Sequence, residues 1–143
     1  MKTLISIILL SVSLYGMSVI KADDDLNGRI FYGKATELTP PDVDRMPRIY
    51  DEVIKFENGI LFCETFRNYS DADSYFTSYV DSRRAIAYKV VVFNSTSTGY
   101  YNGESVEMDF SGNIIGDTSL NGTITIRYQD NSELKFLIEA TAN

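Results

Sequence analysis

From residue 29 onward, apolar and polar residues alternate in short runs, with turn-forming residues between the runs. An alternation of period two is typical of a β-strand that has one buried face and one exposed face. The runs predict about eight or nine short strands and no long helix. The clearest of them lie at residues 29–34, 52–56, 60–66, 74–80, 85–93, 99–110, 120–128 and 133–141.

The segments between these runs predict tight turns and a few longer loops. Asn58-Gly59 separates two apolar runs, and both residues tolerate the positive φ angles of a type I′ hairpin turn. Polar residues at 94–98 and 111–113 predict a loop and a turn, and Gly103 predicts a bend within a strand. We expect an all-β protein, a single antiparallel up-and-down barrel of about 8–9 strands, because closure leaves no exposed edge. A two-sheet β-sandwich is the alternative.

The first 22 residues differ from the rest of the chain. Lys2 is followed by a mostly apolar stretch, then by small residues ending at Ala22 and by three aspartates at 23–25. This order predicts a secretory signal peptide at 1–22, a single barrel domain at 23–143, and a secreted or periplasmic location. A membrane anchor is the alternative, but serines interrupt the apolar stretch and it is shorter than the roughly 20 residues that span a bilayer.

The charge of the chain is acidic, with 13 basic and 20 acidic residues and a net charge of −7. Cleavage of the signal peptide would remove Lys2 and Lys21 and leave a net charge of about −9. Such a surface repels phosphate backbones and anionic lipids, so we expect neither a nucleic-acid partner nor membrane binding after cleavage.

The chain has no histidine and one cysteine, Cys63. Without histidine, neither a Ser-His-Asp nor a Cys-His catalytic site can be assembled, and the commonest zinc ligand is missing. Cys63 lies in an apolar run, which favours a buried thiol; an intermolecular link is the alternative. We expect no enzymatic activity, no metal and no other cofactor.

Aromatic residues are abundant, with ten tyrosines and eight phenylalanines. Facing inward, they would line a cavity in which an apolar ligand stacks while hydroxyl groups orient it. The alternative is that they fill the interior as an ordinary core. The candidate ligand-binding residues are Phe62, Glu64, Tyr79, Tyr88, Tyr101 and Phe136.

Glu64 is the one carboxylate among these candidates. It shares strand phase with Ile60 and Phe62, so it would point inward and need a partner, for which Arg127 or Lys89 are guesses. A local bulge would instead turn it toward solvent, where it would serve no special role.

Three other polar motifs favour ordinary surface roles. The acidic pairs at 42/44 and 71/73 lack the glycine and distal glutamate of a calcium loop, so they predict solvated loops. Arg83-Arg84 predicts a charged turn. The Asn-X-Ser/Thr motifs at Asn68, Asn94 and Asn121 would carry glycans only in a eukaryotic secretory pathway.

Three motifs in the C-terminal two-thirds resemble those of a group of small bacterial secreted proteins. The motifs are Phe56-x-Asn58-Gly59-Ile60-x-Phe62-Cys63, the run 97–103 (STGYYNG) and the run 112–123 (GNIIGDTSLNGT). Tyr101 stands where that group has a tryptophan, and Cys63 falls earlier than the group's cysteine. The resemblance implies a lipocalin-like, calycin-type β-barrel and no established activity.

The functional expectation is non-catalytic binding of a small hydrophobic or amphipathic ligand in the barrel, by a monomer. The alternative is a protein-binding module or secreted inhibitor that acts through its N-terminal arm at 23–26 or through the loop from Pro40 to Pro47. An enzyme using carboxylates and tyrosines is the least favoured class.

Overall fold

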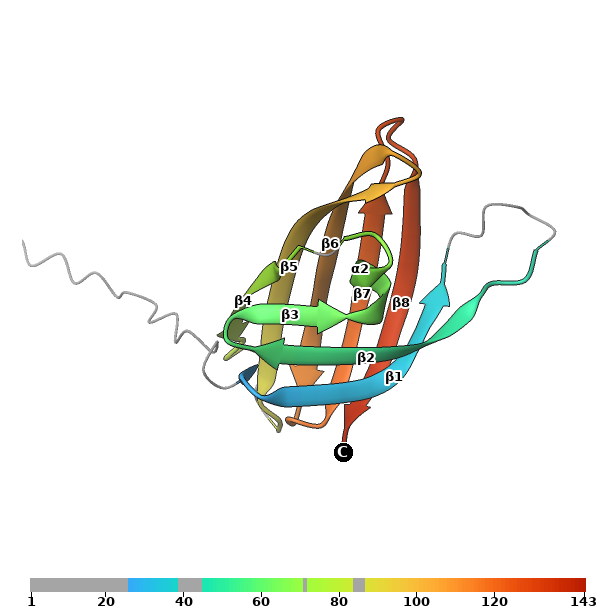
Figure 1. Cartoon of the computed structure of the whole chain (residues 1–143). Helices are drawn as coiled ribbons and strands as arrows, with labels where there is room; N and C mark the ends of the chain where they lie inside the picture. Colours follow the sequence, from blue (N-terminus) through green and yellow to red (C-terminus); the bar gives the residue numbers. More distant parts are fainter. Residues whose placement is uncertain (1–25, 39–44, 71, 84–86) are drawn as a thin grey trace, which may run out of the picture.

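The computed structural model describes residues 26–38, 45–70, 72–83 and 87–143, which form a closed antiparallel barrel (Figure 1). Its elements in chain order are β1 (Arg29–Glu37), β2 (Ile49–Glu57), β3 (Ile60–Cys63), α2 (Glu64–Arg67), β4 (Ser74–Val80), β5 (Val90–Tyr101), β6 (Glu104–Ile115), β7 (Ser119–Arg127) and β8 (Glu133–Ala142). Each strand pairs with the next, and β8 returns to pair with β1. The predicted all-β up-and-down barrel is confirmed. The predicted signal peptide, residues 23–25 of the N-terminal arm, and residues 40–44 of the Pro40–Pro47 loop lie outside the described residues.

Two hairpin turns are made by Asn-Gly pairs. Asn58 and Gly59 have φ angles of 53° and 78°, which confirms the turn predicted between β2 and β3. Asn102 and Gly103 have nearly the same angles, 50° and 82°, and connect β5 to β6. The bend predicted near Gly103 is therefore wrong, since the chain reverses there completely.

The loop predicted at 94–98 is wrong, because these residues lie within β5. The Ser95 side chain points into the barrel, is 1% exposed, and donates a hydrogen bond of 2.8 Å to the carbonyl oxygen of Tyr75. A buried hydroxyl that has a backbone acceptor fits a strand interior, which a count of polar residues does not reveal.

The turn predicted at 111–113 is also wrong, because the segment lies within β6 and the reversal comes at Gly116-Asp117. Gly112 faces Gly122 of β7, and a Cβ atom at Gly112 would lie 2.8 Å from Cζ of Phe93. The Phe93 ring thus occupies the place that a side chain at Gly112 would take. A glycine in a strand often marks such a close approach.

The strands predicted at 60–66 and 85–93 include residues that lie outside the observed strands. The strand predicted at 60–66 ends at Cys63, where the chain turns into α2. The strand predicted at 85–93 begins only at Val90, so Tyr88 precedes it, and residues 84–86 lie outside the described residues.

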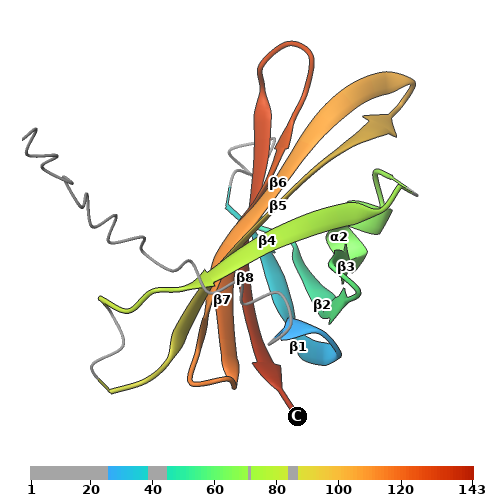
Figure 2. The ribbon, with the colours of Figure 1, turned by 90° about the vertical axis from the view of Figure 1, so that its left-hand side faces the viewer.

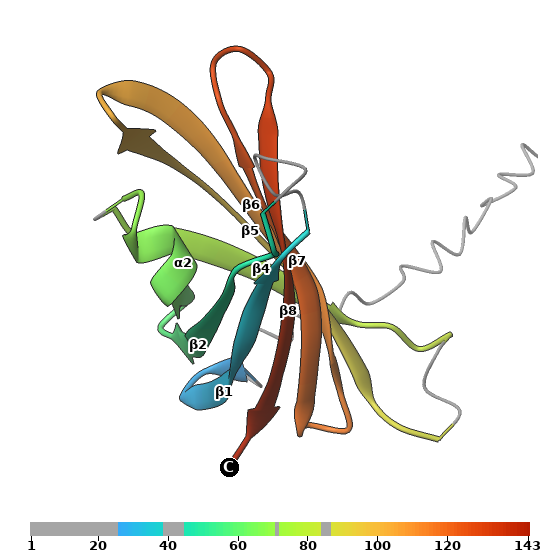
Figure 3. The same cartoon turned by 90° about the vertical axis from the view of Figure 1, so that its right-hand side faces the viewer.

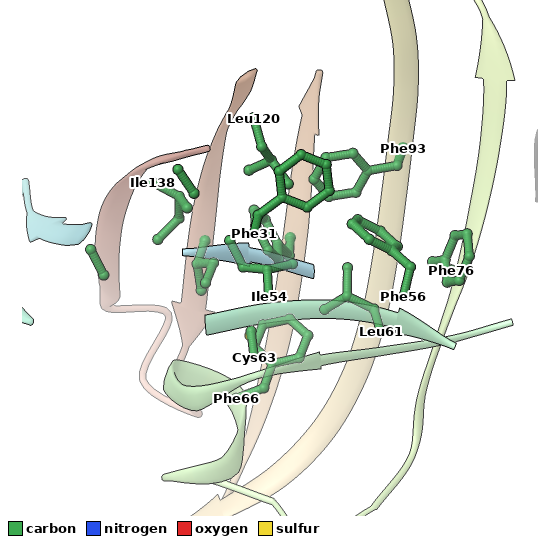
Figure 4. Close-up of a cluster of buried hydrophobic side chains, with 14 of the residues drawn as sticks. Phe31, Ile54, Phe56, Leu61, Cys63, Phe66, Phe76, Phe93, Leu120 and Ile138 are labelled. Atoms are coloured by element: carbon green, nitrogen blue, oxygen red, sulfur yellow. The ribbon is translucent and has the colours of Figure 1, made fainter. Parts of the chain in front are cut away.

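The barrel interior holds a core of phenylalanine and aliphatic side chains (Figure 4). Phe56 contacts three other rings of this core, with ring centroids 5.0 Å from Phe76, 5.2 Å from Phe93 and 6.1 Å from Phe31, all edge to face. Cys63 belongs to the same core, is 1% exposed and is free, as a buried thiol is expected to be.

The two ends of the barrel differ. At one end, the fully buried Leu26 joins the core and the Gly28 amide donates a hydrogen bond of 2.7 Å to the Phe56 carbonyl oxygen. We call this the closed end. At the other end, the β5–β6 and β7–β8 hairpins extend beyond the other strands (Figures 2 and 3). We call this end the mouth.

Candidate functional site at the barrel mouth

The wall of the barrel is incomplete toward the mouth. β3 has only four residues and pairs with β4 at only two positions, Ile60 with Tyr75 and Leu61 with Ser74. Beyond them the chain forms α2, which contacts β2 and β3 (Figure 3). The strand ladder therefore gives way there to a short helix and the segment that follows it.

The segment after α2 attaches to β5. The Tyr100 amide donates a hydrogen bond of 2.8 Å to the Tyr69 carbonyl oxygen. A Cβ atom on Gly99 would lie 2.4 Å from that oxygen, so the contact requires glycine at this position. The arrangement fixes Tyr69 beside the last residues of β5.

The Glu52 side chain binds the N-terminal end of α2. Its side chain is 1% exposed, and its carboxylate accepts hydrogen bonds from the backbone amides of Glu64 (2.6 Å) and Thr65 (3.2 Å) and from the Thr65 hydroxyl. Burial raises the pKa of Glu52, and the hydrogen bonds, which lower it, offset this only in part. A buried carboxylate from β2 therefore satisfies the first amides of the helix.

The raised pKa of Glu52 predicts a pH-dependent stability. Because the folded protein binds this proton more tightly than the unfolded chain, the contribution is fully present below the ordinary pKa of 4.5 and is lost as the pH rises through the folded pKa. The free energy of unfolding of the wild type minus that of Glu52→Gln should therefore decrease upward from pH 4.5. Urea unfolding of both proteins across this pH range measures this difference. The contributions of all other carboxylates cancel in it, because both proteins contain them. A difference that grows with pH would contradict the prediction.

A cavity of about 690 Å³ opens at the mouth. Its apolar lining consists of aromatic rings and one leucine, and its polar lining of two arginines, four carboxylates and small polar side chains. The lining residues are Glu37, Arg45, Arg48, Tyr50, Asp51, Glu64, Thr65, Asn68, Tyr69, Tyr101, Tyr128, Ser132, Glu133, Leu134 and Phe136. They come from α2, from the loops at this end, and from the ends of β1, β2, β5 and β8.

The aromatic rings of the mouth contact one another. The Tyr101 ring centroid lies 5.3 Å from that of Tyr69 and 6.0 Å from that of Tyr128, and the Tyr50 ring lies 6.1 Å from Phe136. Burial, and then interaction with the Tyr128 hydroxyl, raise the pKa of Tyr69 well above its ordinary value. Its hydroxyl therefore stays protonated and can orient a ligand, but it is a poor base.

An ion pair forms part of the cavity wall. Nη2 of Arg45 donates to both carboxylate oxygens of Glu37, at 2.8 and 2.9 Å, and the Arg48 amide donates to the same carboxylate at 3.3 Å. Glu37 is 4% exposed, so this pairing compensates the loss of its hydration. The other terminal nitrogen of Arg45, Nη1, is buried and has no hydrogen-bond partner among the residues that the structure describes.

Three of the six predicted ligand-binding residues line this cavity: Glu64, Tyr101 and Phe136. The inward orientation expected of the other three is wrong, because Phe62, Tyr79 and Tyr88 are exposed and none of them lines this cavity. In β3 and β4 the inward positions belong to the neighbouring residues of opposite phase, such as Leu61 and Phe76. Strand periodicity separates two faces but does not say which of them is buried.

Glu64 also differs from its prediction. It is the first residue of α2, its side chain is 54% exposed, and its ion-pair partner is Arg67 at 3.8 Å. Arg127, the guessed partner, pairs instead with Glu107 and Glu133. The inward orientation was predicted from the alternation along β3, but β3 ends at Cys63, one residue before Glu64.

Sequence reasoning missed most of the mouth, including Tyr50, Tyr69, Tyr128, Arg45 and Arg48. A signal was present: in an up-and-down barrel, the ends of odd strands and the starts of even strands share one rim. Tyr50 is the second residue of an even strand, while Tyr128 directly follows an odd one. Arg45 and Tyr69 lie in connections between strands, where strand phase gives no orientation.

No protein-family model, curated protein or solved structure matches the chain. Within the described ranges, no group of three or more Cys, Asp or Glu side chains could hold a metal ion. The same part of the chain has no helix of the length and apolarity needed to cross a membrane.

Proposed function

We propose that the protein is an exported, non-catalytic binding protein that holds one small amphipathic ligand in the mouth of its barrel. The observation that supports this is the aromatic cavity at the mouth, above an interior that phenylalanine side chains occupy. Its volume of about 690 Å³ falls within the range typical of small-molecule sites. The ligand therefore binds at the mouth. This differs from the expectation from the sequence, which places the ligand inside the barrel.

The lining favours an amphipathic ligand over a purely apolar one. Rings of Tyr69, Tyr101 and Phe136 offer apolar surface, while hydroxyl and guanidinium groups from the same wall offer hydrogen bonds. An apolar lining with a few well-placed polar groups is typical of sites that orient a small molecule. Binding without catalysis is consistent with a chain that has no histidine. Export rests on the signal-peptide pattern of residues 1–22.

Binding of the uncharged fluorescent probe N-phenyl-1-naphthylamine tests this function. Tyr101→Leu removes a ring that contacts two others in the cavity, and we expect it to weaken binding about tenfold, which corresponds to the upper end of an aromatic contact. Tyr88→Leu is the matched control, because Tyr88 is 66% exposed and outside the cavity lining. Equal urea midpoints would show that both variants fold.

Two results would overturn the proposal. One is an absence of saturable probe binding to the wild type. The other is equal weakening by Tyr101→Leu and Tyr88→Leu. Native mass spectrometry of the exported protein adds an independent readout, since a mass excess lost on denaturation would reveal a carried molecule. A bare mass together with no probe binding would favour a protein partner instead.

A further inference from the structure

A count of the charged residues that line the mouth suggests an excess of negative charge, but their ion pairs remove it. Four carboxylates and two arginines line the cavity, but each carboxylate has a basic partner. The pairs are Glu37 with Arg45, Asp51 with Lys34, Glu64 with Arg67, and Glu133 with both Arg127 and Lys135. The carboxylates are therefore neutralised locally, and they do not make the mouth a site for cations.

Arg48 is the exception among the charged groups of the cavity. None of the ion pairs among the described residues involves its guanidinium, which is exposed to the cavity and lies beside the Tyr50 side chain. A guanidinium presents a planar set of N–H donors that matches the two oxygens of a carboxylate or sulfonate. A phenol beside it adds an O–H donor. Both side chains can donate hydrogen bonds to an acidic group.

The surroundings of Arg48 hold its backbone in place. The Glu37 carboxylate accepts from the Arg48 amide, which ties the start of the β2 segment to the end of β1. The same carboxylate holds Arg45, whose Nη1 has no acceptor within the described part of the chain. Tyr50, 6.1 Å from the Phe136 ring, connects this polar end with the apolar lining.

We propose that the ligand is an organic anion, with its acidic group on Arg48 and Tyr50 and its apolar body against the tyrosine and Phe136 rings. This inference rests on the proposed binding function and names the chemical class of its ligand. The overall negative charge of the protein opposes such a ligand at long range, so the interaction depends on the local donors. A protonated amine of the same shape would be repelled by the Arg48 guanidinium and bind more weakly.

A matched pair of probes tests the charge. 8-Anilino-1-naphthalenesulfonate has the ring system of N-phenyl-1-naphthylamine with one sulfonate added. We expect Arg48→Gln to weaken binding of the sulfonate about tenfold or more, as loss of a charge-assisted contact does, and to change binding of the uncharged probe less than about twofold. Tyr50→Phe, which keeps the ring, should weaken only the sulfonate, by a smaller factor. The control Arg29→Gln removes the same charge at the closed end, where Arg29 pairs with Asp117, and should leave both probes unchanged.

The outcomes separate this inference from the function on which it rests. If only the uncharged probe binds, the inference that the ligand is an anion is overturned, and the proposed binding function is retained. Failure of both probes to bind would overturn both proposals. Equal effects of Arg48→Gln on the two probes, or equal effects of Arg48→Gln and Arg29→Gln on the sulfonate, would show that Arg48 does not contact the acidic group.

Discussion

Phe56→Ala should lower the free energy of unfolding by about 3–5 kcal/mol, the usual cost of truncating a buried phenylalanine. The Phe56 side chain is fully buried, and its ring contacts those of Phe31, Phe76 and Phe93 edge to face. Truncation removes the transfer free energy of the ring and leaves a space that the closed barrel cannot collapse to fill. Equilibrium urea unfolding measures the change.

Phe62→Ala is the matched control for this prediction. Phe62 belongs to β3, which pairs with β2, the strand of Phe56, but its side chain points outward and is 39% exposed. We expect Phe62→Ala to lower the free energy of unfolding by less than about 1 kcal/mol, as most surface substitutions do. Similar losses for both variants would contradict an interior packed around Phe56. They would reopen the possibility that a ligand occupies the centre of the barrel.

Gly33→Ala should destabilise the protein by about 3 kcal/mol, at the upper end for overpacking. Gly33 lies in β1 opposite Ala140 of β8, in the pairing that closes the barrel. A Cβ atom there would lie 2.0 Å from the Glu139 carbonyl oxygen and 2.5 Å from Cα of Ala140, both backbone atoms. Because backbone cannot rotate away as a side chain can, the added methyl group must push β1 and β8 apart.

The neighbouring substitution Lys34→Ala controls for Gly33→Ala. It changes the same strand at an exposed side chain whose ion pair with Asp51 is also exposed. Exposed ion pairs contribute little to stability, so we expect Lys34→Ala to lower the free energy of unfolding by less than about 1 kcal/mol. Thermal or urea unfolding compares the two variants. A Gly33→Ala protein as stable as Lys34→Ala would mean that the β1–β8 seam does not have the close contact described above.

Local sequence signals succeeded where the physical cause was itself local. Asn58-Gly59 predicted its hairpin because two residues that tolerate positive φ are sufficient for that turn. The same signal at Asn102-Gly103 was interpreted as a bend, although the angles there are equivalent. Gly112 could not be interpreted correctly from the sequence, because its reason is the Phe93 ring that lies against it from a different strand.

The candidate site was predicted less well than the fold. Tyr101 and Phe136 were identified and do line the mouth, whereas Phe62 and Tyr79 lie on the outside. Alternation along a strand gives two faces, and only packing against other strands decides which one is buried. The Arg45–Glu37 pair joins β1 to the loop that follows it, and its burial depends on the surrounding wall of the mouth.

The sequence by itself determined that the described domain is an all-β meander, that histidine-dependent catalysis is excluded, and that the charge is acidic. These conclusions depend on residue identity and on a period of two, which are properties of the chain. Only the tertiary structure decided that β8 closes on β1, that phenylalanines occupy the interior, and that Tyr50, Tyr69, Tyr101 and Arg48 meet at one end. Those features depend on contacts between residues far apart in sequence. No pattern along a single strand specifies the strand register and ring packing that create them.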